Sequence, residues 1–353
     1  MKKVQKMPTN KEFAALCNFK NARIAVIGDI MLDVYLWGSV TRISPEAPVP
    51  VVDVLRRSCC PGGAANVMRN ISTVGAKAVA FGVIGEDSSG DDLLVQLAEH
   101  QIDTTGIIRC AGRRTTEKCR VIAGAQQLCR ADFEESGPVA ADIRERMTTA
   151  VCELISAGKV DAVIFDDYAK GVLHASMLAE IIKCAQKSGV ITVLDPKPKA
   201  GGVTPVSGLT LLKPNRSEAF ALAGISDPGP ASSPQEDRAL AAAAAKIFDI
   251  WHPENLLISL AGQGMILYPA KGDFCVIPTR AREVFDVSGA GDTVAAVASV
   301  AMATGADPVL AAGLANCAAG VVVGKIGTAP VFYDELLNAI SQKQENSSAN
   351  KGY

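Results

Sequence analysis

The sequence predicts an α/β fold in which a doubly wound, mostly parallel sheet carries helices on both faces and a small projecting β-lid. Short apolar runs rich in β-branched residues alternate with segments of helical spacing, as in parallel sheets covered on both faces. The chain of 353 residues is 48% hydrophobic but only 5% aromatic, which suits helices packed on a sheet through small residues. Residues 40–54 and 115–132 break the alternation and indicate the lid.

The strands of the main sheet are expected where apolar runs are shortest and most continuous. The first is IAVI at residues 24–27, and similar runs follow at 77–83, 160–165, 190–194, 209–212 and 256–260. Helical spacing fills gaps between them, at 66–74, 91–100 and 238–250. Strands separated by helices pair in parallel, because the crossover helix returns the chain to the starting edge of the sheet.

The two segments that break the alternation are expected to be antiparallel strands. Residues 40–54 contain three prolines and no helical period, and residues 115–132 resemble a hairpin with its turn near Gly124. We therefore expect lid segments near 39–56 and 113–132, over the sheet edge where α/β folds bind ligands. The alternative is that both are surface excursions.

Composition excludes several kinds of function. The net charge of −2 and the lack of a polybasic face exclude nucleic acid as a partner, and no uncharged apolar run is long enough to span a membrane. The ten cysteines and three histidines show no metal-ligand spacing, so we expect reduced thiols in a cytoplasmic protein. The division expected along the chain is an N-terminal extension over 1–20, a main domain over 21–341 and a flexible tail over 342–353.

The most informative motif is DVSGAGDT at residues 286–293. Gly289, Ala290 and Gly291 let main-chain N–H groups approach a ligand, and the apolar run after Asp292 predicts a helix. The helix N-terminus would attract a phosphoryl group in transit, and Asp292 would take the proton from an alcohol. The alternative is that Asp292 is only an N-cap or first-turn acid.

Three further segments have residue types that bind ligands. Asp33 lies just after the first strand, and Gly62, Gly63 and Asn66 precede a predicted helix, so these residues could hold sugar hydroxyls or form ordinary turns and caps. Asn215 and Glu218 are three residues apart, so they could order Mg²⁺ on a triphosphate through water or form a capping box. The turn at residues 259–264 could line a nucleotide pocket or close a hairpin.

Two apparent nucleotide motifs are discarded. GVVVGK at residues 320–325 is one residue short of a P-loop. Neither late Gly-x-Gly pair has the third glycine of a dinucleotide fingerprint, which disfavours a nicotinamide oxidoreductase.

In this order, the segments resemble the ribokinase-like, pfkB-type family of carbohydrate kinases. The resemblance covers about residues 20–340 and is strongest in PGGAANVMRNISTVGAKAVAFGVIGEDSSG (61–90) and DVSGAGDTVAAVAS (286–299). Within the family, the chain is most similar to the kinases of D-glycero-D-manno-heptose 7-phosphate. That similarity lies in TRISPEAPVPVV (41–52), TTEKCRV (115–121), QQLCRADFE (126–134), DDYAKGVL (166–173) and DPKPK (195–199).

The resemblance implies ATP-dependent phosphorylation of the C1 hydroxyl of this heptose phosphate, in lipopolysaccharide core synthesis. ATP and Mg²⁺ are the implied cofactors, with a monovalent cation left open. Separately, pairing two projecting lids would cover their exposed edges, so we expect a homodimer through the lid. Because the chain stops at Tyr353, before the nucleotidyltransferase domain of bifunctional relatives, we expect a stand-alone kinase. Runner-up interpretations are another pfkB-type sugar or nucleoside kinase and a non-catalytic sugar-binding regulator.

The resemblance also assigns roles to the motif residues. Asp292 would be the base, beside the anion hole of Gly289, Ala290 and Gly291. The nucleotide and its Mg²⁺ would be held by Asn215, Glu218 (through water), Ser259, Gly262, Gly264 and Asn316, and the sugar by Asp33, Gly62, Gly63 and Asn66.

The substrate's own phosphate needs a cationic clamp. Lys118 and Arg120 are the favoured pair, because strand alternation places both on one face of the second lid hairpin. The alternative is an exposed charged edge strand. Further candidates are Arg130, Lys170 and Lys197.

Overall fold

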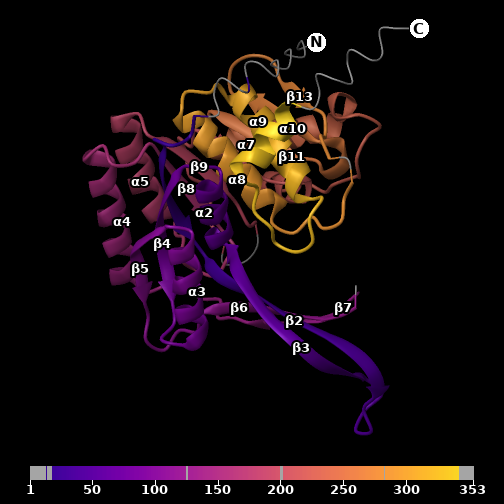
Figure 1. The fold of residues 1–353 in the computed structure, drawn as a ribbon. Coiled ribbons are helices and arrows are strands. Elements are labelled where there is room, and N and C mark those ends of the chain that lie inside the picture. The colour runs from indigo at the N-terminus through magenta and orange to yellow at the C-terminus, as the bar shows by residue number, and fades with distance from the viewer. Residues whose placement is uncertain (1–12, 14–17, 125, 199–201, 282, 342–353) are drawn as a thin grey trace.

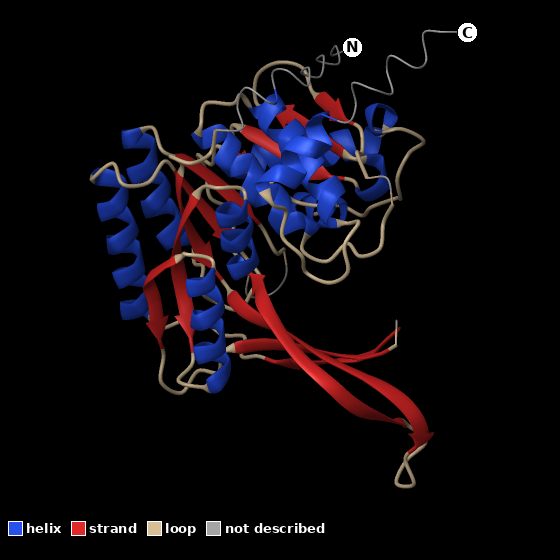
Figure 2. Cartoon of the chain, in the orientation of Figure 1, coloured by secondary structure: helices blue, strands red, loops and turns tan. Residues whose placement is uncertain are grey.

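The structure of the protein, a computed structural model, describes residues 13, 18–124, 126–198, 202–281 and 283–341. Helices lie on both faces of a central sheet, and a smaller sheet projects from the body (Figure 2). The predicted doubly wound α/β fold with a lid is therefore confirmed. The central sheet has nine strands, in the spatial order β13 (Cys275–Ile277), β12 (Met265–Pro269), β11 (Asn255–Ser259), β10 (Leu211–Leu212), β9 (Ile191–Asp195), β8 (Ala162–Asp166), β1 (Arg23–Gly28), β4 (Lys77–Ile84) and β5 (Asp103–Arg109).

The strand register brings the carboxyl ends of the central strands to one edge. β1 is parallel to β4 and β8, and Gly28, Asp166 and Asp195 are aligned at the ends of β1, β8 and β9. The chain adds β4 and β5 on one side of β1 and later strands on the other side. This change of direction beside β1 is the kind of place where open α/β sheets bind ligands.

Two apolar cores lie on opposite faces of the sheet. Ile24 and Val26 of β1 pack into one core, whereas Ala25 and Ile27 pack into the other, because successive strand side chains point to opposite faces. The first core is covered by α2 (Ala64–Thr73), α3 (Ser88–Glu99), α8 (Ala290–Ala303), α9 (Pro308–Val322) and α10 (Tyr333–Ser341). The second is covered by α4 (Ala141–Ser156), α5 (Ala175–Ser188), α6 (Arg216–Ala223) and α7 (Arg238–Trp251).

The lid is a four-stranded sheet that extends well away from the body (Figure 1). Its strands are β3 (Pro50–Gly63), β2 (Ile30–Ile43), β6 (Thr116–Ala123) and β7 (Gln126–Phe133), in that spatial order. The hairpins β2–β3 and β6–β7 are antiparallel, as expected, and β2 joins β6 in parallel.

The lid reaches closer to the main sheet than the sequence pattern indicated. Only Asp29 separates β1 from β2, and β3 runs as far as Gly63, where α2 begins. Asp33 therefore lies inside a lid strand, not in a loop after β1. The apolar start of β2 gave no sign that the chain changes sheets there.

Other differences are small. β10 has two residues where four were expected, and β5 was not expected. The expected tail over 342–353 and most of the extension over 1–20 lie outside the described residues. Among helices in the described ranges, none has both the length and the apolarity needed to cross a bilayer.

Phe165, at the centre of the sheet, allows a test of the second core. Its side chain is fully buried on β8, so Phe165→Ala should lower the free energy of unfolding by about 3–5 kcal/mol. Val95→Ala, on the solvent face of α3, should change it by less than about 0.5 kcal/mol. Urea denaturation measures both, and equal effects would contradict this description of the core.

Candidate active site

A pocket of about 1140 Å³ lies at the carboxyl edge of the central sheet. It is bordered by the start of α8, the start of α6, the turn between β11 and β12, and the ends of β8 and β9. All the residues predicted for the nucleotide and the anion hole line it, namely Asn215, Glu218, Ser259, Gly262, Gly264, Asn316, Gly289, Ala290 and Gly291, together with Asp292.

The start of α8 has the form of an anion site. Gly289 is the N-cap, with φ of 76°, and has no side chain to cap the first N–H groups of the helix. A Cβ added to Gly289 would lie 2.7 Å from Asn66 Nδ2, so only glycine fits. The N–H of Ala290 donates to the Val287 carbonyl oxygen at 3.2 Å, so the first-turn amides that can bind a negatively charged group in the pocket are those of Gly291 and Asp292.

Asp292 is not the N-cap, since it lies within the first turn of α8. Its side chain is buried, and its two oxygens accept hydrogen bonds of 2.8 Å, Oδ2 from Asn66 Nδ2 and Oδ1 from the Tyr168 hydroxyl. Burial raises the pKa of Asp292 to about 6, although these two hydrogen bonds act to lower it. Such a carboxylate is mostly ionised at neutral pH and can take a proton from an alcohol.

Two more carboxylates accompany Asp292. One oxygen from each of Asp166, Asp195 and Asp292 lies within 4.8 Å of the others, and Lys213 Nζ pairs with Asp195 at 2.8 Å. Within the described residues, both oxygens of Asp166 are buried without a hydrogen-bond partner. Burial, and then the charge of Asp292, raises the pKa of Asp166 well above its ordinary value. Unpartnered carboxylate oxygens are the donors that a hard divalent cation takes.

Sequence reasoning missed Asp166, Asp195, Lys213 and Tyr168 as site residues. A usable signal existed for the two acids, because both end buried strands, as VIFD and VITVLD. Lys213 likewise follows the end of β10 directly.

No local pattern pointed to Tyr168, because its loop is shaped from a distance. The carboxylate of Asp29 accepts hydrogen bonds from the main-chain N–H groups of Tyr168, Lys170 and Val172, at 2.9, 3.0 and 3.3 Å. Ala169 between them has φ of +56°. Asp29 therefore fixes the loop that presents the tyrosine hydroxyl to Asp292.

The start of α6 forms the capping box, which is one of the two alternatives offered by the sequence, and both residues also line the pocket. Asn215 Oδ1 accepts from the Glu218 N–H, and Glu218 Oε2 accepts from the Asn215 N–H, each at 2.9 Å, so a capping box is present. The other Glu218 oxygen pairs with Lys197 Nζ at 2.8 Å. Glu218 and Lys197 both line the pocket, which Lys118 and Arg120 of the lid do not. Lys197 therefore lies with the residues predicted for the nucleotide.

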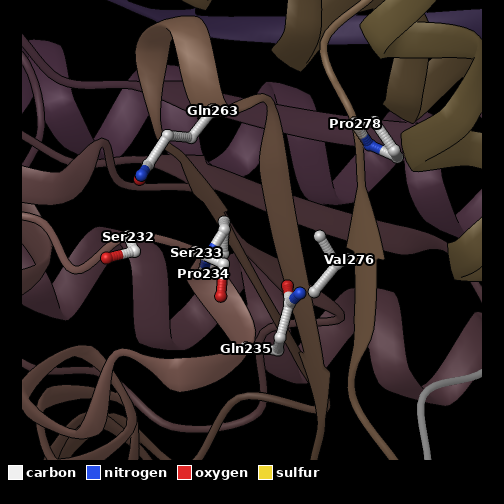
Figure 3. A pocket seen from close by; sticks show the side chains of 7 residues that line it. All are labelled: Ser232, Ser233, Pro234, Gln235, Gln263, Val276 and Pro278. Atoms are coloured by element: carbon white, nitrogen blue, oxygen red, sulfur yellow. The ribbon is translucent and has the colours of Figure 1, made fainter.

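The turn between β11 and β12 also has both predicted features, because it closes a hairpin and borders the pocket. A Cβ on Gly264 would lie 2.2 Å from the Ile277 carbonyl oxygen, whereas Gly262 faces open space. Gln263 also lines a second pocket of about 450 Å³, formed with residues 232–235, Val276 and Pro278 (Figure 3).

The residues predicted for the sugar form a chain of contacts that leads to Asp292. Asp33 Oδ2 accepts from the Thr328 hydroxyl at 3.1 Å, and a Cβ on Gly62 would lie 2.7 Å from this same oxygen. Thr328 also borders Gly289, which in turn lies against Asn66. Gly63 has φ of +53° at the root of the lid.

The predicted clamp cations all lie in ion pairs, and Lys118 and Arg130 share Asp132. Arg120 donates to Asp33 Oδ1 at 2.6 Å, and Arg130, half exposed, pairs with Asp132 at 2.7 Å. Lys118 and Lys170 are brought together, because both contact the carboxylate of Glu134.

This fold and this pocket, with a carboxylate beside a helix N-terminus, define a phosphotransferase that acts on an alcohol. The chain belongs to the pfkB family of carbohydrate kinases, whose profile matches residues 21–334.

Comparison with curated proteins identifies bifunctional relatives. The bifunctional protein HldE of Pelobacter propionicus is 40% identical over 330 residues, and that of Trichlorobacter lovleyi is 41% identical over 324 residues. These alignments cover 94% and 92% of this chain but only 65% and 64% of the relatives, so the chain spans slightly less than two thirds of their length.

Solved structures share the fold at low sequence identity. Arabidopsis thaliana ribokinase complexed with ribose and ATP has a TM-score of 0.67 and 17% identity, covering 91% of this chain and 99% of that one. Phosphofructokinase-2 from Escherichia coli in complex with potassium has a TM-score of 0.70 and 18% identity, covering 92% and 99%.

The anion site can be tested with two matched glycine substitutions. Gly289→Ala should lower kcat by roughly 10- to 100-fold, because the new methyl group displaces Asn66 from Asp292 and strains a positive φ. Gly189→Ala, which strains a similar positive φ of 67° at the end of α5 but faces open space and does not line the pocket, should leave kcat within about twofold. Steady-state kinetics with saturating ATP and sugar measures both. Similar kcat values for the two variants would contradict the close packing at Gly289.

Proposed function

We propose that this kinase transfers the γ-phosphoryl group of ATP to the C1 hydroxyl of D-glycero-D-manno-heptose 7-phosphate. The product is the 1,7-bisphosphate, on the route to ADP-heptose and the lipopolysaccharide core in the cytoplasm. The observation that carries this proposal is a pair of largely buried lysines, Lys118 and Lys170, beside the predicted sugar residues. They suit an acceptor that brings its own phosphate. The heptose follows from the sequence resemblance, and the relatives' 40% identity supports it.

The chain's own groups account for the transfer step. The acceptor oxygen forms a bond to the γ-phosphorus, the bond from that phosphorus to the bridging oxygen breaks, and ADP leaves. Asp292 takes the hydroxyl proton, and the first-turn amides of α8 stabilise the equatorial oxygens. The pocket of about 1140 Å³ is large enough for the nucleotide.

Mg²⁺ bound with ATP would neutralise charge on the phosphates. The carboxylates suited to hold it are Glu218, acting through water, and the unpartnered Asp166 with Asp195. Lys213 offsets part of the negative charge of the cluster when the pocket is empty.

Positioning of the sugar depends on Asp33 and Asn66. Arg120 and Thr328 hold the two oxygens of Asp33, which fixes the orientation of its carboxylate. Arg120 orients Asp33, a predicted sugar residue, whereas Lys118 and Lys170 share Glu134, which lies outside regular secondary structure, so the two lysines are the better candidates for the phosphate clamp. Arg130 lies further out on the edge strand β7.

We also propose that two copies pair through their lids. The outer part of the β2–β3 hairpin exposes large apolar side chains, with Ile43 62% and Leu55 79% exposed. Val40, Val49 and Val54 add to this surface. An apolar patch on an exposed sheet is a usual place for self-association.

Asp292→Asn tests the proton acceptor. The amide keeps the size of the side chain and can still bond to Asn66 and Tyr168, so the protein should fold with an unchanged melting temperature. It cannot accept the proton, so kcat should fall by roughly 10²- to 10⁴-fold. Asp307→Asn, at the start of α9 away from the pocket, is the control. A kcat near that of the wild type would remove the role given to Asp292.

An ADP-release assay over an acceptor panel tests the proposed substrate. Heptose 7-phosphate should be preferred over free heptose, ribose, fructose and adenosine. Lys170→Gln should raise the KM for heptose 7-phosphate by about 10- to 100-fold, which corresponds to one charge-assisted hydrogen bond, without affecting free heptose. Lys187→Gln, exposed at the end of α5, should change neither KM.

Other results of the same assay would overturn the assignment. A clear preference for ribose, fructose or adenosine would remove heptose phosphate as the substrate. If Lys170→Gln weakened phosphorylated and free sugars equally, the clamp would be wrong. A lack of ADP release with every acceptor would favour a sugar-binding regulator.

A further inference from the structure

A carboxylate of the protein itself lies between the two clamp lysines. Glu134 follows directly after β7, and its Oε1 is 2.5 Å from Lys170 Nζ while its Oε2 is 2.8 Å from Lys118 Nζ. The lysine side chains are only 7% and 14% exposed. Glu134 therefore supplies the negative charge that two lysines so far removed from water require.

These three residues come from separate segments that meet beside the acceptor site. Lys118 on β6 is in register with Asp33 on β2. Lys170 is two residues beyond Tyr168, whose hydroxyl donates to Asp292. Glu134 enters from a third segment, the connection between β7 and α4. Lys118 thus lies beside the predicted sugar residue Asp33, and Lys170 lies near the tyrosine that contacts Asp292. Glu134 comes from neither of these two parts of the acceptor site.

Glu134 is the member of this cluster that can leave. Its side chain is 26% exposed, more than either lysine, and it lies outside regular secondary structure. Lys118 would keep a second partner, Asp132 Oδ2 at 2.9 Å. Among the described residues, the Ser136 hydroxyl at 3.5 Å would be the one remaining hydrogen-bond partner of Lys170 Nζ, so a new anion would be attracted there.

A phosphate monoester is a better partner for this pair than a carboxylate. It has a charge of about −1.5 to −2 at neutral pH and three acceptor oxygens, against one charge and two oxygens for Glu134. Glu134 is itself ionised, because hydrogen bonds from Lys118 and Lys170 outweigh the effect of burial and lower its pKa. When a phosphate monoester binds, the Glu134 carboxylate is therefore replaced by an anion with more charge and more acceptor oxygens.

We infer that Glu134 is an internal substitute for the acceptor's phosphate: it occupies Lys118 and Lys170 in the empty enzyme and is displaced when a phosphorylated sugar binds. This inference rests on the proposed function for the statement that the acceptor has a phosphate. Competition from Glu134 lowers the apparent affinity of the two lysines for every anion, so small anions such as inorganic phosphate are kept out. A phosphorylated sugar overcomes it, because its hydroxyls are bound at the same time.

The test compares Glu134→Gln with Glu135→Gln, an exposed neighbour of the same type. The melting temperature is measured against inorganic phosphate at constant ionic strength, with Mg²⁺ and a non-hydrolysable ATP analogue filling the nucleotide pocket. Glu134→Gln should bind phosphate about fivefold more tightly than the wild type, and Glu135→Gln should match the wild type. The KM for heptose 7-phosphate should fall by a similar factor, with the KM for ATP unchanged.

Two further variants show where the phosphate binds. Adding Lys170→Gln to Glu134→Gln should abolish the gain in phosphate affinity. Glu134→Asp, which keeps the charge but is too short to reach both lysines, should give a smaller change in the same direction, and it replaces Glu134→Gln if that variant does not fold.

The inference is overturned if Glu134→Gln binds phosphate no more tightly than the wild type, or if the gain persists without Lys170. The substrate proposal fails separately. If Glu134→Gln tightens phosphate binding through Lys170 but the enzyme ignores heptose 7-phosphate, the exchange stands and the heptose assignment falls.

Discussion

The buried carboxylate of Asp292 is the constraint on which the rest of the site depends. Although its side chain is buried, this carboxylate stays mostly ionised at neutral pH with the help of the hydrogen bonds that Asn66 and Tyr168 donate to its two oxygens. Asn66 is itself held by Arg69, whose Nη2 donates to its Oδ1 at 2.8 Å. Tyr168 depends on the loop organised by Asp29. Elements from both ends of the chain thus converge on one side chain at the N-terminus of α8.

The same requirement for charge balance extends across the pocket. Lys213 lies against Asp195, Arg120 against Asp33, and Glu134 between Lys118 and Lys170. Each pair is removed from water, so each would be unfavourable if one partner were lost. In the exchange inferred for Glu134, a phosphorylated sugar would replace one partner of Lys118 and Lys170 without leaving either lysine uncompensated.

The sequence predicted the layered fold and one side of the site well, because those features are local. Strands such as β1 and β8 are continuous apolar runs, and the turn before Asp292 is readable from its small residues. The hydroxyl of Tyr168 and the carboxylate of Asp292 are 124 residues apart in the chain, so no pattern of spacing could join them. The lid was predicted, but its strands were placed too far from the main sheet. The reason is that a largely apolar run such as the start of β2 could belong to a strand of either sheet.

The way in which the lid is attached has a consequence for movement. β2 leaves the main sheet one residue after β1, and β3 returns directly into α2. The ribbon therefore has the residues predicted to bind the sugar, Asp33, Gly62 and Gly63, at its root and its exposed apolar side chains at its tip. β2 and β3 stay paired from root to tip, and the register shifts at Trp37/Gly38 and Val40/Arg42 are where such a long ribbon bends most readily. The inner part, up to Trp37, therefore moves with the predicted sugar residues, while the apolar tip can tilt about these two irregularities.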